Sequence, residues 1–180
     1  MKKILIIALT ITTINGMAQQ IVPLFGDADI YISNSGHYYK DVDNDFDKFV
    51  GTWKWIDNSN SWTVVLKKIL QIDDGDGYTY DALYGEYQYI ENGIEKVNTL
   101  ANINDSNIHP LSHKISNPLI IANHHLPQCL DCEVNERRIS ITIEHPNFSQ
   151  ITGELIMIHR NEGGIEKIYL NILDGQGKFT

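Results

Sequence analysis

The sequence is poor in basic residues. Its 180 residues include 14 Lys and Arg against 23 Asp and Glu, so the formal net charge at pH 7 is −9. The basic residues are scattered along the chain and form no cluster. An acidic chain of this kind is repelled by nucleic acid and by anionic membrane surfaces. We therefore expect no nucleic acid among its partners.

Common catalytic motifs are also missing. The chain has no Gly-x-Ser-x-Gly nucleophile elbow, no phosphate-binding Walker loop and no His-Glu-x-x-His metal motif. Carboxylates are numerous, but sequence alone does not distinguish a catalytic pair from solvated acids. The sequence therefore predicts a protein that is not an enzyme and that requires no cofactor.

Only one long apolar run is present, and it lies near the N-terminus. Two lysines precede the run 4–14, and Gly16-Met17-Ala18 follows it as a small-x-small cleavage site. The run is shorter than the roughly 20 residues that span a bilayer as a helix. This order is typical of a secretory signal peptide over residues 1–18. We therefore predict a soluble protein, secreted or periplasmic, with no segment inserted in a membrane.

Cysteine occurs only twice, at Cys129 and Cys132. In an exported chain such a pair is normally oxidised. The sequence therefore predicts a local disulfide whose small ring pins one loop rather than the whole fold. Thiol redox chemistry is disfavoured, because no helical pattern surrounds Cys129 to lower the pKa of a thiol.

A transition-metal site in the same segment is an open alternative. Imidazole and thiolate groups suit zinc or copper, and Cys-x-x-Cys is a usual half-site. Four of the seven histidines lie close to the two cysteines in the sequence. The candidate ligands are His109, His113, His124, His125, Cys129 and Cys132.

What the chain has in abundance is alternation of apolar and polar residues, the pattern of half-buried strands. It is clearest at Ile139, Ile141 and Ile143, and again along 165–173. Turn-forming residues separate these segments, and no long helical period occurs. We count seven or eight strands and predict an all-β fold with an antiparallel sheet.

Regular alternation begins after a short apolar cluster. The apolar spacing over residues 46–50 predicts one helical turn before the first strand, and Gly51 ends that turn. Trp53 and Trp55 then share one face of the strand.

This opening resembles that of a family of secreted bacterial proteins of unknown function. Here it runs from Tyr39 to Trp53 and contains Lys40-Asp41 and Gly51-Thr52-Trp53. The Gly-x-Trp start is also similar to that of lipocalin and related calycin barrels. The resemblance implies a lipocalin-like antiparallel β-barrel in which Trp53 plugs the closed end. The arginine that would stack on this tryptophan is Arg137, Arg138 or Arg160. An open sheet or a sandwich with a buried tryptophan is the alternative.

The resulting domain division has three parts. After the signal peptide 1–18, residues 19–42 show no clear period and are predicted as an extended N-terminal segment. Residues 43–180 are predicted as a single lipocalin-like β domain.

Five of the nine tyrosines lie between residues 78 and 90. They are ordinary strand residues packed on their neighbours, or they line a ligand cavity with apolar walls and hydroxyl tips. In the second interpretation the domain is a non-catalytic binder of a small apolar or aromatic ligand. The candidate ligand-binding residues are Trp53, Trp55, Tyr78, Tyr80, Tyr84, Tyr87 and Tyr89.

Two other functions remain open. One is a metal-binding protein that uses the segment 109–132. The other is a structural or surface interaction module, which would expose an apolar patch or an uncapped edge strand.

Overall fold

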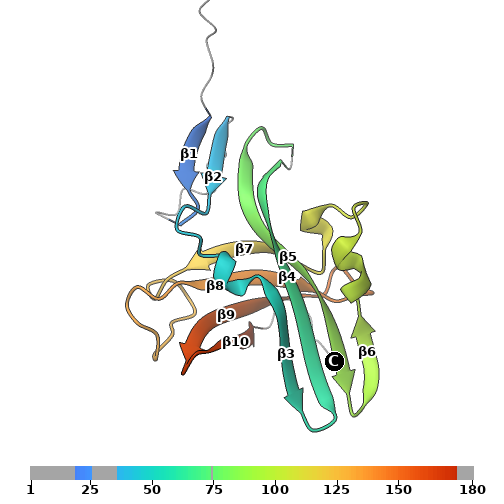
Figure 1. The fold of residues 1–180 in the computed structure, drawn as a ribbon. Helices are drawn as coiled ribbons and strands as arrows, with labels where there is room; N and C mark the ends of the chain where they lie inside the picture. The colour runs from blue at the N-terminus through green and yellow to red at the C-terminus, as the bar shows by residue number, and fades with distance from the viewer. Residues whose placement is uncertain (1–18, 26–35, 74, 174–180) are drawn as a thin grey trace, which may run out of the picture.

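A computed structural model of the chain describes residues 19–25, 36–73 and 75–173, and the predicted signal peptide lies outside these residues. The described part is all-β, with ten strands and three short 3-10 helices (Figure 1). The strands are β1 (Gln20–Pro23), β2 (His37–Lys40), β3 (Gly51–Asp57), β4 (Asn60–Asp73), β5 (Thr79–Glu91), β6 (Ile94–Asn98), β7 (Ile115–Ile121), β8 (Arg138–Glu144), β9 (Thr152–Glu162) and β10 (Ile165–Leu173). The 3-10 helices are η2 (Asp47–Phe49), η3 (Leu100–Asn104) and η4 (Pro110–Ser112). Ten strands exceed the seven or eight predicted, partly because β1 and β2 are too short to show a period.

Strand β5 is the centre of the sheet. One of its edges pairs with β4, from Ser61 opposite Ile90 to Asp73 opposite Thr79. Its other edge is shared by β2, β7 and β6. From β7 the sheet continues through β8 and β9 to β10.

The sheet curls into a half-barrel and does not close (Figure 1). Strands β3 and β10 lie at the two ends of the curl. Among the described residues, β3 pairs only with β4 and β10 only with β9. The predicted lipocalin-like barrel is therefore present only as a half-barrel in the described residues, where no ladder of hydrogen bonds joins its two ends.

Two further details of the predicted fold are corrected near the N-terminus. Strand β1 runs parallel to β2, and β2 runs parallel to β5, so the sheet is mixed rather than antiparallel. The helical turn over 46–50 exists as η2 and directly precedes β3. It does not precede the first strand, since β1 and β2 come earlier in the chain. Both strands lie within the predicted N-terminal segment 19–42.

Side chains from both halves of the curl fill the space between them. Alternating residues of β4, β5, β7, β8 and β9 meet there, and Phe49 of η2 and its N-cap residue Phe46 join them. The buried cluster is Leu24, Tyr39, Phe46, Phe49, Val64, Leu66, Leu83, Tyr87, Ile115, Ile120, Ile139, Ile141, Ile143, Leu155 and Met157. The inside of the half-barrel is therefore a packed core, and the hollows described below lie at its margins.

Asp41 lies in the segment that precedes Gly-Thr-Trp in the sequence. Its buried carboxylate connects this segment to strand β4. The residue is 2% exposed. One carboxylate oxygen accepts from the backbone N–H of Asp45, and the other accepts from the N–H of Phe46 and from Lys68 Nζ on β4 at 2.9 Å. Because a buried carboxylate is expensive unless it is paired and hydrogen-bonded, these contacts fix the loop before η2 against the sheet.

Two buried tyrosines should make the protein sensitive to alkali. The Tyr38 hydroxyl donates to Asp81 Oδ1 at 2.6 Å, and burial, this hydrogen bond and the nearby carboxylate charges raise the pKa of Tyr38. Burial, with a smaller contribution from the charge of Glu86, raises the pKa of Tyr87 to about 12. The pKa of a tyrosine in an unfolded chain is about 10.

Because both groups hold the proton more tightly in the folded state, their contribution to stability is complete below about pH 10 and is lost as the pH rises through the folded-state pKa. We expect the free energy of unfolding to fall from about pH 10 upward. Ultraviolet titration of tyrosinate should show a late phase that is smaller in Tyr87→Phe. A Tyr87→Phe titration curve with an undiminished late phase would contradict this.

Candidate functional site

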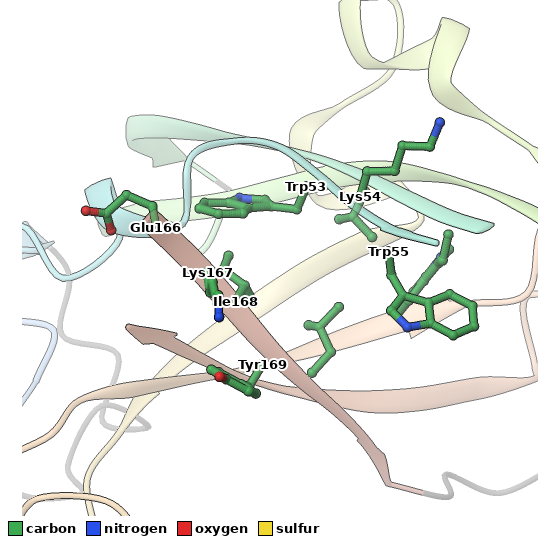
Figure 2. A pocket seen from close by; sticks show the side chains of 10 residues that line it. Trp53, Lys54, Trp55, Glu166, Lys167, Ile168 and Tyr169 are labelled. Atoms are coloured by element: carbon green, nitrogen blue, oxygen red, sulfur yellow. The ribbon is translucent and has the colours of Figure 1, made fainter. Parts of the chain in front are cut away.

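An open groove lies where the two ends of the half-barrel approach each other. It has a volume of about 360 Å³ and runs between β3 and β4 on one side and β10 on the other. We call it the tryptophan groove, because all three tryptophans of the chain line it. Figure 2 shows the Trp53 and Trp55 rings on the β3 side and Ile168 on the β10 side. The lining residues are Trp53, Lys54, Trp55, Trp62, Val64, Glu166, Lys167, Ile168, Tyr169 and Leu170.

The tryptophans are held to different degrees. Trp53 donates its indole N–H to the backbone oxygen of Phe49 at 2.8 Å and packs against the core. Trp62 contacts Tyr87 edge to face, with ring centroids 6.4 Å apart. Trp55 is 52% exposed. The groove therefore combines a fixed floor with one aromatic side chain that is open to solvent.

The residue that packs against Trp53 is a histidine, not the arginine implied by the lipocalin resemblance. His159 on β9 contacts the Trp53 ring at a centroid distance of 6.2 Å, and its Nε2 atom lies against a carboxylate oxygen of Glu166. The three candidate arginines have other contacts: Arg137 lies over Phe25, Arg138 is buried, and Arg160 pairs with Glu136 and Asp131.

Charged groups occupy the rim of the groove on the β10 side. Lys167 pairs with Glu162 at 2.5 Å, and Tyr169 donates its hydroxyl to the same carboxylate. These hydrogen bonds raise the pKa of Lys167 and lower the pKa of Glu162. The rim therefore keeps its charges over the ordinary pH range, while the floor is aromatic and aliphatic.

The predicted tyrosines do not join the tryptophans in one site. Tyr78 and Tyr80 line a second groove of about 360 Å³, at the other margin of the core, together with Tyr39 and residues of β7. Tyr84 packs against His113, and Tyr87 is buried with its hydroxyl on the backbone oxygen of Glu144. Tyr89 lies opposite Trp62 in the β4–β5 ladder. The tyrosines of 78–90 thus divide among several environments, because they are spread along the 13-residue strand β5 and the residue before it, and successive side chains point to opposite faces.

The structure joins Cys129 and Cys132 in a disulfide, as predicted. The bond lies in the loop between β7 and β8, which Arg138 also fixes through the backbone oxygens of Ala122 and Pro127 at 3.1 and 2.8 Å. Among the described residues, the one close group of metal-ligating atoms is Cys129, Asp131 and Cys132. Since its sulfur atoms are bonded to each other, they are not available as thiolate ligands.

The four candidate histidines are also separated. His109 accepts a hydrogen bond from the Leu111 N–H within η4. His113 is buried against Glu86, with 2.8 Å between Nδ1 and Oε1. His124 and His125 lie side by side, and His125 accepts from the Ala122 N–H. The structure therefore does not assemble the predicted six-residue metal set.

Trp62, Ile168 and Leu170 line the groove but were not predicted as site residues from the sequence. Their alternation with polar neighbours could have identified them, because each lies on the face of its strand that points into the half-barrel. What was missing was the approach of β3 and β10, which are separated by more than one hundred residues and share no ladder.

No helix in the described ranges has the length and apolar character needed to cross a membrane. Comparison with curated proteins and with solved structures finds no similar protein. A family model does match, and it covers residues 1–180. The chain belongs to this family, DUF6705, a family of unknown function.

Proposed function

We propose that this protein is an exported, non-catalytic binding domain that holds a small apolar or aromatic molecule in the tryptophan groove. The observation that carries the proposal is the gathering of all three tryptophans, with Ile168 and Leu170, around one groove. Its volume of about 360 Å³ lies at the lower end of the range of small-molecule sites. Export is supported by the pattern of residues 1–18 and by the disulfide, which is characteristic of oxidising compartments.

The arrangement of the groove suits an aromatic ligand better than a fully polar one. Aromatic rings favour stacked or edge-to-face contacts, worth about 0.5–1.5 kcal/mol each beyond the burial of area. Trp55 is exposed enough to stack on a ligand, and the aliphatic side chains of β10 provide the opposite wall. No group of the floor is arranged as a nucleophile with its base, so binding rather than catalysis is the proposed role.

Binding of the neutral fluorescent probe N-phenyl-1-naphthylamine tests the proposal. We expect saturable binding with energy transfer from tryptophan to the probe, because all three donors border the site. Trp55→Ala should weaken binding by roughly tenfold, since one stacking contact of about 1–1.5 kcal/mol is lost. The side chain is half-exposed, so the core should be unaffected.

Ile94→Ala is the matched control, because Ile94 is 61% exposed and lies on β6, away from the groove. It should bind the probe like the wild type. Thermal unfolding of both variants excludes loss of fold as the cause. Equal weakening in both variants, or no saturable binding by the folded wild type, would sink the proposed site.

A further inference from the structure

The tryptophan groove is bordered by two strand edges that lack a neighbour. In the described ranges β3 bonds only to β4, and β10 only to β9. A strand edge presents a row of backbone N–H and C=O groups that can pair with another chain. Five consecutive residues of β10, Glu166–Leu170, border the groove, compared with three of β3. The edge of β10 is thus the longer of the two pairing surfaces.

The floor beneath these edges is apolar. Trp53, Trp62, Ile168 and Leu170 are partly buried and pack on the core, yet they also line the groove. Their remaining exposed surface faces the groove between the edges of β3 and β10. A segment in that space would place every second side chain on this floor, because strand side chains alternate between faces.

The outward-facing neighbours of such a segment are basic on both sides. Lys54 on β3 and Lys167 on β10 both border the groove, and Lys54 has no ion pair among the described residues. Opposite charges directly across a strand pair are stabilising, and like charges are destabilising. Glu162 already compensates Lys167, so Lys54 is the stronger attraction for an acidic side chain at an outward position.

We propose that the groove accepts an extended peptide segment of a partner protein, which adds to the edge of β10 and carries alternating apolar and polar residues with an acidic one outward. This rests on the tryptophan groove as the binding site of the proposed function, and the peptide would occupy the same space as the small molecule, so the two ligands exclude each other. Backbone hydrogen bonds to β10 supply affinity, and the apolar floor selects the alternate side chains, as in other cases of strand addition.

A synthetic hexapeptide, acetyl-Val-Thr-Val-Glu-Val-Thr-amide, tests this with the purified protein. It contains no aromatic residue, so tryptophan fluorescence reports binding directly. Two analogues are N-methylated at alternate residues, one at the valines and one at the other three positions. Each analogue keeps the side chains and blocks the N–H donors along one edge of the peptide.

We expect saturable binding of the parent peptide and a loss of roughly tenfold or more for at least one analogue, because removing several backbone hydrogen bonds of about 1 kcal/mol each forfeits that affinity. Lys54→Glu should weaken the parent peptide severalfold. Lys96→Glu, an exposed change on β6, should leave it unchanged.

Three results would overturn the inference. The first is equal binding of the parent and both analogues, which indicates apolar contact without strand pairing. The second is binding of N-phenyl-1-naphthylamine without binding of the peptide, which leaves the proposed function standing. The third is a dimer of the free protein by sedimentation that the peptide dissociates, which makes a second copy the occupant of the edge.

Discussion

Replacing His113 with leucine should lower the free energy of unfolding by about 3–5 kcal/mol, the usual effect of removing one partner of a buried ionisable pair. His113 is 3% exposed and Glu86 is 1% exposed, and 2.8 Å separates Nδ1 from Oε1. The second carboxylate oxygen of Glu86 has no hydrogen-bond partner among the described residues. Without the imidazole, the whole carboxylate is therefore buried and unsatisfied.

The double variant Glu86→Met with His113→Leu separates this cause from loss of packing. An apolar pair of similar volume removes both polar groups together, and such replacements are often neutral or stabilising. Leucine also keeps an apolar contact with the Tyr84 ring, whose centroid lies 4.7 Å from that of His113. We expect the double variant to recover most of the stability lost in His113→Leu.

Chemical denaturation with linear extrapolation measures both variants. The single changes should be strongly non-additive, because the two side chains contact each other. Additive losses, with the double variant the least stable, would show that packing rather than an unsatisfied carboxylate controls this site.

The disulfide could be predicted from the sequence because a short segment determines it. Cys129 and Cys132 are close in the chain and are its only two cysteines. Their pairing could therefore be predicted without knowledge of the fold. The same holds for η2, where local spacing and the following glycine define one turn. The strand alternation of β8 and β10 was readable for the same reason, since period two is a local property.

The open end of the half-barrel could not be predicted in this way. Closure depends on whether β3 and β10 reach hydrogen-bonding distance, which is set by the accumulated twist and bend of the intervening strands. The parallel pairing of β2 with β5 involves only two residue pairs and leaves no periodic signal. A resemblance at the first Trp-containing strand therefore says little about the last strand.

The aromatic site was only partly predictable. Trp53 and Trp55 do line the groove, but the tyrosines of β5 divide among the second groove, the core and the opposite face. In the sequence Tyr80 and Tyr84 share one parity and Tyr87 and Tyr89 the other, a change of phase that is typical of a β-bulge near Gly85. The structure instead has an unbroken β4–β5 register through Gly85 and a shift in β4 between Ile69 and Ile72.

Glycine is required at position 85 because strand β4 lies too close for a side chain, and not because β5 has a bulge there. Gly85 lies opposite Leu66 on β4 and opposite Ile115 on β7, at the point where β5 joins the two halves of the sheet. A Cβ atom at this position would lie 2.4 Å from the backbone oxygen of Val65 and 2.7 Å from Leu66 Cδ2. The first of these atoms belongs to a paired strand and has little freedom to move.

We therefore expect Gly85→Ala to destabilise the protein by about 3 kcal/mol or more, at the upper end of overpacking effects. Gly93→Ala provides the matched control, because a Cβ there meets no atom of the described part of the chain within 4 Å and only the positive φ of 75° is strained. That strain is worth about 1–2 kcal/mol. Adding Leu66→Ala to Gly85→Ala should not restore stability, since the closest obstacle is the backbone of Val65. Rescue by Leu66→Ala, or equal losses in Gly85→Ala and Gly93→Ala, would mean that β4 can shift and that the junction of the half-barrel is looser than its register implies.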